Sequence, residues 1–247
     1  MKRVLCPELP KPGKPCRVPE AEAHHLIRVL RLESGDRVQA LDGQGRSVIA
    51  VLKFPKGEAW LEFDEAPAAA EVPGGPEVIL EVCVLKGEAM EWVIEKAVEL
   101  GVSRLVPVLA TRTIVQTGKK GPEAFQERWQ RIADQALKQC GRLARMSVEL
   151  PARLEDVVRA PNPRFFFDEA SRADSAGLLS TLRSHSGPAR LLLGPEGGWT
   201  DEERAMIRAS GQAQSVSLGP LVLRAETAAI AAVSIVTAAL RETLAAR

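Results

Sequence analysis

A regular alternation of apolar strands and amphipathic helices, from residue 77 onward, constrains the fold of this chain most. The segment 77–86, EVILEVCVLK, is typical of a buried strand, and apolar residues then recur along one helix face at Met90, Val93, Ile94, Ala97 and Val98. The same alternation predicts strands at 104–110, 164–170, 190–194 and 214–218, with helices from about 123, near 176–184, from 200 and over about 225–245. Strands that alternate with helices pair in parallel and are covered on both faces, so an α/β fold is predicted.

The segment 191–203, LLLGPEGGWTDEE, leads one of these strands through a glycine-rich loop into a helix. Thr200 and Glu203 have capping-box spacing, which marks the helix start. The loop has neither a phosphate-binding lysine nor G-x-G-x-x-G spacing, and it carries the acidic Glu196. Glycine allows close approach of backbone to a ligand, which we expect to be neutral or cationic here. A plain connecting loop, whose glycines only serve the turn, is the alternative.

The C-terminal segment 217–236, SLGPLVLRAETAAIAAVSIV, has a similar order of features. A strand is expected to end at Leu218, Gly219–Pro220 to form a turn, and a short loop to lead into an apolar helix. Two Gly-Pro loops at the ends of successive strands predict a single cleft at the carboxyl edge of a parallel sheet.

Residues 37–54, RVQALDGQGRSVIAVLKF, alternate around Asp42–Gly43 and predict a β-hairpin in a small N-terminal region. The segment 64–76, DEAPAAAEVPGGP, has the composition of a linker. We therefore expect two domains, at residues 1–70 and 76–247.

Charge is distributed unevenly along a chain whose net charge is only +1. Residues 112–145 include eight basic and three acidic residues, a local net charge of +5. The predicted helix there has an apolar face, and its basic side chains fall roughly on the opposite stripe at Arg128, Arg131, Lys138, Arg142 and Arg145. The apolar face is expected to consist of Trp129, Ile132, Ala133, Ala136, Leu137 and Cys140. The stripe is either a polyanion-binding surface or an ordinary solvated face. In the small domain, His24, Arg28 and Arg31 recur at helical spacing and support the polyanion-binding interpretation.

Other features exclude several functional classes. Four cysteines without a CxxC motif favour reduced thiols in a cytoplasm over disulfides or zinc, and adjacent His24 and His25 do not make a metal site. No signal peptide is predicted, and the longest apolar run falls short of the roughly 20 residues that span a bilayer. We expect a cytoplasmic protein with no metal and no membrane.

Four motifs in order resemble the RsmE family, the ribosomal RNA uridine-N3 methyltransferases of the SPOUT class. They are HHLIRVLRLESGD with DGQG, KGEAMEWVIEKAVELGV, QCGR at 139–142, and the pair GPEGG and LGPLVLRAETA. The resemblance implies a SPOUT-type α/β trefoil-knot domain with a small β-rich PUA-like N-terminal domain. It also implies a homodimer that methylates 16S ribosomal RNA, in the assembled small subunit, with S-adenosyl-L-methionine. By matching position, it places the cofactor against Leu193, Gly194, Glu196, Gly198, Leu218, Gly219 and Leu223. The chain departs from the family pattern at Cys140, Met146, Leu221 and Ala225.

The chemistry of methyl transfer to a uridine assigns further roles on the RNA side. Arg224 is expected to stabilise the uridine anion, with a helix-start ion pair as the alternative. Glu226 is expected either to accept the N3 proton or to favour the helix dipole. RNA contacts are assigned to Arg112 and Arg142, which match family positions, and to the basic residues Arg28, Arg31 and Arg131. Trp199 is expected to stack on an unpaired or flipped base, with a hydrophobic staple at the helix start as the alternative. A ribose 2′-O-methyltransferase and a non-catalytic RNA-binding assembly factor are the alternative functions.

Overall fold

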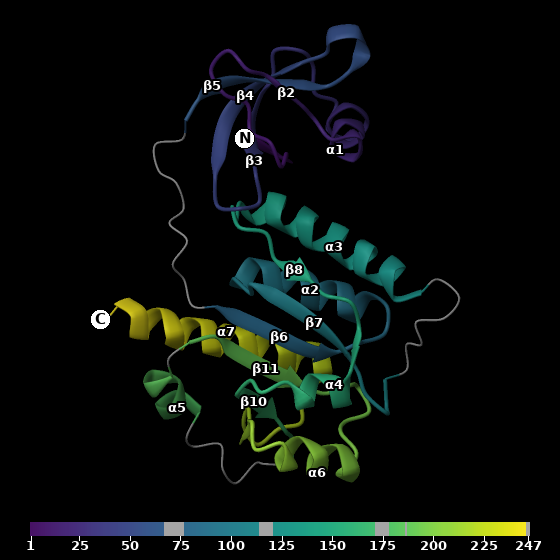
Figure 1. Cartoon of the computed structure of the whole chain (residues 1–247), viewed down its shortest axis with the longest axis vertical. Coiled ribbons are helices and arrows are strands. Elements are labelled where there is room, and N and C mark those ends of the chain that lie inside the picture. The colour runs from purple at the N-terminus through teal and green to yellow at the C-terminus, as the bar shows by residue number, and fades with distance from the viewer. Residues whose placement is uncertain (67–76, 114–120, 171–177, 186, 246–247) are drawn as a thin grey trace. The chain divides into compact units, whose positions relative to one another are not determined.

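The computed structural model describes residues 1–66, 77–113, 121–170, 178–185 and 187–245 (Figure 1). The chain divides into two compact units. The first comprises Met1–Gly74 with Asp134–Arg145, and the second comprises Gly75–Ala133 with Met146–Arg247. Helix α3, Gly121–Cys140, supplies residues to both units. The expected boundary at 70–76 lies outside the described residues.

The first unit contains a five-stranded sheet in the order β1-β3-β4-β5-β2. Strand β1 pairs in parallel with β3, and the other pairs are antiparallel. The predicted hairpin at Asp42–Gly43 is confirmed, because β3 and β4 pair across it and Gly43 has a φ of +73°. The strands are β1 (Lys2–Leu5), β2 (Cys16–Arg17), β3 (Arg37–Leu41), β4 (Ser47–Lys53) and β5 (Trp60–Glu65). A 3-10 turn, η2 (Pro55–Gly57), precedes β5.

A short helical segment packs on this sheet, and it ends earlier than its sequence suggested. Helix α1 (Glu20–His24) continues into the π-helical turn η1 (His25–Val29), whose Leu26 is fully buried in the core of the unit. Arg31 lies beyond the turn with a φ of +54°, a left-handed conformation. The expectation that His24, Arg28 and Arg31 share one helix face is therefore wrong for Arg31, since the helix stops before it.

The second unit is built on a parallel sheet in the order β12-β10-β11-β6-β7-β8, with β9 also paired to β7. Every described strand pair in it is parallel, as the alternation predicts. Strand β12 ends at Val216 rather than at Leu218, because Ser217 already turns the chain toward Gly219. The strands are β6 (Val78–Cys83), β7 (Arg104–Leu109), β8 (Ser147–Val148), β9 (Ala152–Arg153), β10 (Arg164–Phe167), β11 (Ala189–Leu193) and β12 (Ala213–Val216).

Helices cover both faces of this sheet. Helix α7 (Ala225–Ala245) lies against β6 and β11 and packs with α2 (Glu88–Leu100) and α5 (Leu178–Ser184). On the opposite face, α4 (Leu154–Arg159) and α6 (Asp201–Ala209) pack on Phe166 and Leu192. All five apolar residues predicted for the inner face of α2 are buried, and Gly101 ends that helix with a φ of +96°. The α/β prediction is thus confirmed in architecture.

The basic stripe predicted along α3 is broken up in the structure. The helix ends at Cys140, so Arg142 and Arg145 lie beyond it, and Cys140 is exposed although it was expected to face inward. Arg145 forms two hydrogen bonds with Asp134, Arg128 pairs with Glu91, and Lys138 pairs with Glu22. Most of the expected positive surface is therefore neutralised by neighbouring carboxylates.

Two further expectations concern the linker and membrane-spanning segments. The linker prediction begins too early, because Asp64 and Glu65 belong to β5 and both pair with Arg37. Of the predicted linker, residues 67–76 lie outside the described residues. Among the helices of the described residues, none is long and apolar enough to cross a membrane.

Candidate functional site

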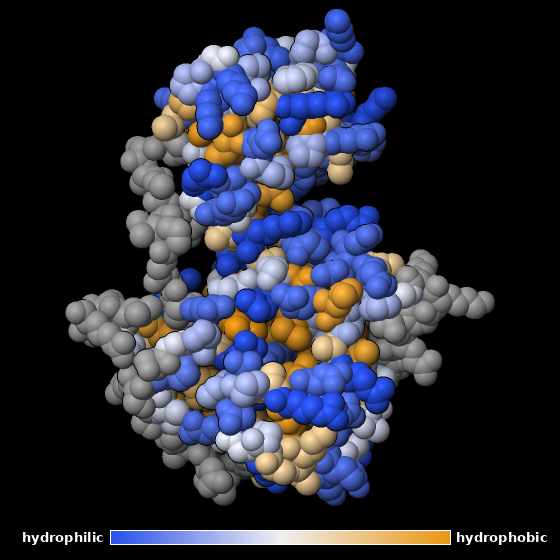
Figure 2. All heavy atoms as spheres, viewed as in Figure 1, coloured by the Kyte–Doolittle hydropathy of each residue, from blue (hydrophilic) through white to orange (hydrophobic). Residues whose placement is uncertain are grey.

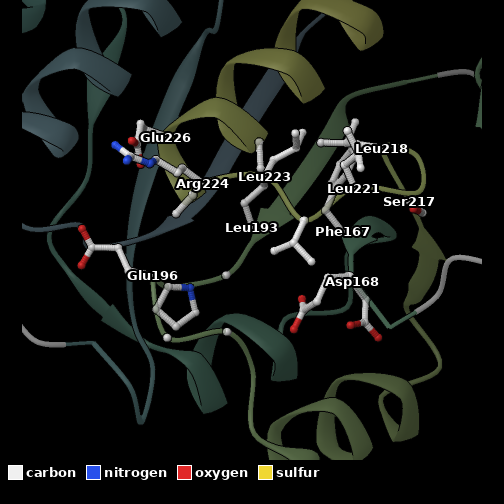
Figure 3. A pocket seen from close by; sticks show the side chains of 18 of the residues that line it. Phe167, Asp168, Leu193, Glu196, Ser217, Leu218, Leu221, Leu223, Arg224 and Glu226 are labelled. Carbon is white, nitrogen blue, oxygen red and sulfur yellow. The ribbon is translucent and has the colours of Figure 1, made fainter.

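A cavity of about 620 Å³ opens at the carboxyl ends of β10, β11 and β12 in the second unit (Figure 3). The chain leaves each of these three strands at the same edge of the sheet, so three loops meet there. The prediction that the two Gly-Pro loops form one cleft is confirmed, since both line this cavity. The lining residues comprise Phe167–Glu169, Leu193–Gly198, Val216–Gly219, Leu221–Glu226, Ala89 and Ala228.

The structure brings together most of the residues singled out from the sequence. All seven residues assigned to the cofactor line the cavity, and so do both assigned to catalysis, Arg224 and Glu226. Sequence reasoning missed Asp168 and Glu169, which follow β10 and line the same cavity. Their signal was the DE that ends the predicted strand RFFFDEA, at the same sheet edge as the two glycine loops.

The glycine-rich loop is shaped from beneath by Trp199, which is only 1% exposed. Its Nε1–H donates to the carbonyl oxygen of Phe167 (3.3 Å), and its ring meets Phe166 edge to face. The prediction that Trp199 stacks on a target base is therefore wrong, because its ring is part of the hydrophobic core. A Cβ built on Gly194 would lie 2.8 Å from Nε1 of Trp199, so glycine is required at 194 by the indole below the loop.

The predicted capping box is confirmed, and it does more than start α6. The Thr200 hydroxyl accepts from the backbone of Glu203, and the Glu203 carboxylate accepts from the backbone of Thr200 (2.9 Å). The second oxygen of that buried carboxylate accepts from the backbone N–H of Thr111 (2.7 Å). Glu203 therefore joins the glycine loop to the segment that follows β7. Arg112 adds a second link, because its Nη1 donates to the Gly197 carbonyl oxygen (2.8 Å).

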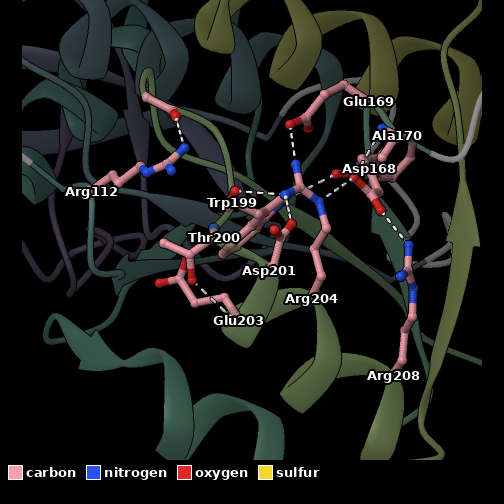
Figure 4. Close-up of polar contacts among 12 residues, drawn as sticks. Arg112, Asp168, Glu169, Ala170, Trp199, Thr200, Asp201, Glu203, Arg204 and Arg208 are labelled. Atoms are coloured by element: carbon pink, nitrogen blue, oxygen red, sulfur yellow. Dashed lines mark hydrogen bonds and ion pairs between the residues drawn. The ribbon is translucent and has the colours of Figure 1, made fainter.

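Arg204, on the first turn of α6, connects the loop after β10 to the glycine loop (Figure 4). Its Nε donates to Asp168 (3.1 Å), its Nη1 donates to the Trp199 carbonyl oxygen (2.8 Å), and its Nη2 pairs with Glu169. Arg208, one turn later, donates to the other oxygen of Asp168 (2.7 Å). The Asp168 side chain is fully buried, and these two arginines compensate its charge. Asp168, part of the cavity wall, is therefore held in place by two side chains of α6.

The second loop, from Ser217 to Arg224, contributes both a turn and an exposed apolar surface. The Ser217 hydroxyl accepts from the backbone N–H of Gly219, whose φ of +120° favours glycine. Leu221 is 76% exposed, and Val222 is similarly open. Arg224 is the N-cap residue of α7, because its carbonyl oxygen accepts the Ala228 N–H (2.8 Å). Its exposed side chain lies near that of Glu226 at one side of the cavity (Figure 3).

The cavity combines apolar walls with an excess of acidic groups. Leucine side chains and Phe167 lie between Arg224 on one side and Asp168 on another (Figure 3). Four carboxylates line the cavity, namely Asp168, Glu169, Glu196 and Glu226. Asp168 and Glu169 pair with Arg204 and Arg208, so Glu196 and Glu226 remain against the single lining cation Arg224, a formal charge of −1. Such a lining favours a ligand with an apolar part and cationic groups over a polyphosphate. This agrees with the expectation drawn from the loop sequence. Among the described residues, no group of acidic, histidine or cysteine side chains could hold a metal ion.

The remaining predicted RNA-binding residues lie outside the cavity. Arg28 and Arg31 are exposed in the first unit, and among the described residues neither forms an ion pair. Hydrophilic side chains predominate on the visible face of that unit (Figure 2). Arg131 is exposed and donates to the Glu127 carbonyl oxygen, whereas Arg142 is half-buried. RNA contact by these four residues stays a prediction.

Comparisons with known proteins agree with the geometry of both units. Residues 73–237 match the model of the RNA methyltransferase domain, and residues 18–64 match that of the RNA methyltransferase PUA domain. The chain is 35% identical to the ribosomal RNA small subunit methyltransferase E of Synechocystis, over 89% of this chain and 72% of the relative. It is 28% identical to the Bacillus subtilis enzyme of that name, over 87% of each.

A solved structure gives the same result in three dimensions. The chain superimposes with a TM-score of 0.81 on a ribosomal RNA small subunit methyltransferase E from Neisseria gonorrhoeae bound to S-adenosyl methionine. The identity is 28%, and 95% of each chain is covered. The second unit thus has the SPOUT-type α/β trefoil-knot fold, and the first contains the small β-rich PUA-like domain. Because the RNA methyltransferase domain model matches well over half of the chain and the Synechocystis relative exceeds 30% identity, the chain belongs to the ribosomal RNA small subunit methyltransferase E family.

Proposed function

We propose that this protein methylates N3 of a uridine in 16S ribosomal RNA, with S-adenosyl-L-methionine as the methyl donor. The observation that carries the proposal is the cavity formed by GPEGG and LGPLVLRAETA, which contains every residue assigned to the cofactor and both assigned to catalysis. The match to the family models and to the cofactor-bound Neisseria gonorrhoeae structure supports it.

The residues present fit S-adenosylmethionine, which supplies an electrophilic methyl group carried on a sulfonium. The cavity volume of about 620 Å³ lies in the usual range for small-molecule sites. Leu193, Leu218 and Leu223 offer apolar walls for a nucleoside, and Gly194 and Gly219 also line the cavity. The acidic excess of the lining suits the cationic sulfonium and ammonium groups. Asp168, held by Arg204 and Arg208, fixes one wall before any ligand enters.

The chemistry of the acceptor assigns tasks to Arg224 and Glu226. Methylation at N3 requires the loss of the N3 proton, and the resulting negative charge spreads over the adjacent carbonyl oxygens. Arg224, exposed at the mouth of the cavity, presents a planar cation that can stabilise this charge. Glu226 lies in the first turn of α7, so its carboxylate also interacts favourably with the helix N-terminus. We assign proton acceptance at N3 to Glu226, since its side chain lies near that of Arg224 (Figure 3).

The substrate is proposed to be 16S ribosomal RNA in the assembled small subunit, in the cytoplasm. N3 of a paired uridine is hidden by its partner base, so the target must be unpaired or flipped out. The PUA-like domain offers Arg28 and Arg31 for phosphate contact. Arg112, Arg131 and Arg142 are assigned the same task in the rest of the chain, with Arg112 beside the cavity loop.

The active form is proposed to be a homodimer. Helices α2 and α7 pack against each other, and each exposes a large apolar side chain, Trp92 (45% exposed) and Ile235 (36% exposed). Exposed apolar groups on neighbouring helices support a protein interface. Light scattering of the wild type and of a Trp92→Glu variant tests this: the variant should be monomeric, and an unchanged mass would contradict the assignment of this surface.

The function itself is tested by methyl transfer to small subunits isolated from a strain that lacks this enzyme. Mass spectrometry of the digested RNA should locate one new methyl group on a uracil base. A methyl group on ribose would instead identify a 2′-O-methyltransferase. RNA binding without detectable S-adenosylmethionine binding in calorimetry would identify a non-catalytic assembly factor, and either result would overturn the proposal.

A further inference from the structure

Two thiols that play no part in methyl transfer meet in the core of the first unit. Cys6 directly follows β1, and Cys16 is the first residue of β2. Their sulfur atoms are 3.6 Å apart, and both residues are buried. The Cys6 sulfur also lies 3.6 Å from the carbonyl oxygen of Arg17, which accepts its S–H in an alternative orientation. A disulfide bond between them requires the sulfurs to approach by about 1.5 Å more.

One of the two cysteines borders a cavity. Cys16 lines a second cavity, of about 680 Å³, whose walls all come from the first unit. The segment Pro7–Pro15, which connects the two cysteines, forms much of the rim. Lys11 and Lys14 line it together with a single acid, Glu8; Arg46 also lines it, but its guanidinium pairs with Asp42. The cavity therefore favours small anionic molecules, while Cys6 lies behind Cys16 and does not line it.

The hydrogen bond between the thiols makes them chemically unequal. Donation by Cys6 stabilises a thiolate on Cys16 and lowers the pKa of Cys16 against the opposing effect of burial. The same bond, together with burial, raises the pKa of Cys6 well above its usual range. A thiolate is the attacking species in disulfide exchange, so Cys16 is the thiol that reacts first.

We propose that Cys6 and Cys16 form a reversible disulfide site that reacts, through this cavity, with anionic low-molecular-weight disulfides. In the first step the Cys16 thiolate attacks one sulfur of the reagent, and one reagent thiolate leaves. In the second step the Cys6 sulfur attacks the Cys16 sulfur, the second reagent thiolate leaves and takes up the Cys6 proton. Two protein thiols are thereby oxidised to one disulfide, and one reagent disulfide is reduced to two thiols.

Once the mixed disulfide has formed, Cys16 carries no negative charge. The hydrogen bond that held the proton on Cys6 is then lost, so Cys6 becomes easier to deprotonate for the second step. The product joins the end of β1 to β2 and closes the Pro7–Pro15 segment into a loop. Closure of a loop restricts the unfolded chain, so the oxidised protein should resist thermal unfolding of the first unit better than the reduced one.

The full-length native protein is incubated with glutathione at a fixed total concentration and a rising oxidised fraction, then denatured in acid and labelled with N-ethylmaleimide. Both cysteines fall in one tryptic peptide, residues 4–17, because Lys11 and Lys14 are each followed by proline. We expect this peptide to lose both maleimide labels together and to weigh about 2 Da less than the reduced, unlabelled peptide, since two hydrogen atoms are removed. Buried Cys83, in the second unit, should remain a labelled thiol throughout and report that the protein stayed folded.

Variants separate the two steps. Cys6→Ser should stop at a glutathione adduct on Cys16, Cys16→Ser should leave Cys6 unmodified, and the matched control Cys140→Ser should behave as the wild type. The proposal is overturned if the wild-type peptide keeps both labels under conditions that modify exposed Cys140. Glutathione on both cysteines of the peptide without a cross-link would overturn it equally. The wild-type measurement stands even if a variant fails to fold.

Discussion

Replacement of Gly194 by alanine separates two explanations for a glycine in the cofactor loop. If glycine is needed so that a ligand can approach the backbone, alanine should weaken cofactor binding and leave the fold intact. The structure points instead to Trp199, whose Nε1 and Cε2 atoms would lie 2.8 Å and 2.9 Å from the new Cβ. Ordinary contact starts at 3.4 Å, so the indole must move by about 0.6 Å.

The indole has little freedom to move. It is buried, its N–H is bonded to the Phe167 carbonyl oxygen, and its ring packs on Phe166. Overpacking of a buried site costs about 1–3 kcal/mol, and a weakened hydrogen bond adds about 1 kcal/mol, so Gly194→Ala should lower the free energy of unfolding by about 2–4 kcal/mol. For a unit of this size the unfolding temperature should fall by about 5–15 °C.

Differential scanning calorimetry measures the fall in unfolding temperature. Titration with S-adenosylmethionine measures cofactor affinity in the same variants. Gly197→Ala is the matched control in the same loop, because its Cβ would lie 3.2 Å from the Cβ of Arg112, a milder overlap than the 2.8 Å at Gly194. In a double-mutant cycle, Trp199→Leu should reduce the loss of unfolding free energy that Gly194→Ala causes, because leucine is smaller than the indole. If Gly194→Ala leaves the unfolding temperature unchanged but weakens cofactor binding, the steric explanation is refuted. Glycine would then be needed at 194 so that the ligand can approach the backbone.

Arg224→Ala should lower kcat in single-turnover methylation by about 10²–10³ with little change in cofactor affinity, and Arg224→Lys should recover little; normal turnover would leave Arg224 a structural role. Replacing Arg28 by glutamine and Arg31 by asparagine, which tolerates the left-handed backbone, should reduce the salt dependence of RNA binding by about 1.5 in log–log slope. An unchanged slope would mean that neither residue touches phosphate. Burial alone would raise the pKa of Asp42, but hydrogen bonds from the backbone of Arg46 and Gln44 and from the Arg46 guanidinium hold that pKa below its usual value. The carboxylate therefore stabilises the first unit above about pH 4, and the effect is lost as the pH falls through its folded pKa. Asp42→Asn should cost about 1–3 kcal/mol at pH 7, and unfolding curves should converge in acid; a pH-independent difference would contradict this.

The sequence determined the larger strands and helices of the second unit and their order, whereas α4 and the short strands β8 and β9 were not predicted. Periodicity located the inner face of α2, the capping box at Thr200 and the hairpin at Asp42, because each depends on residues close together in the chain. The parallel sheet followed from the alternation of strands and helices. The cleft between the Gly-Pro loops followed as well, since parallel strands end at one edge.

The errors concern contacts between distant residues. The basic stripe on α3 was drawn from spacing alone, and it failed because Glu91 and Glu22, far away in sequence, pair with Arg128 and Lys138. Cys140 was placed inside because spacing does not show where a neighbouring element stops covering a helix.

Local sequence therefore decided which segments form helices and strands and which loops face the cavity. Only the tertiary structure decided what each loop residue contacts. The sequence shows Trp199 only as an aromatic residue in a predicted binding loop. In the fold its ring packs against Phe166, and it leaves no room for a Cβ at position 194. Asp168 reads as the end of a strand, yet Arg204 and Arg208 from a later helix fix it in the cavity wall. Burial and charge compensation depend on which residues from elsewhere in the chain pack around a given side chain. A local sequence pattern does not show which distant residues these are.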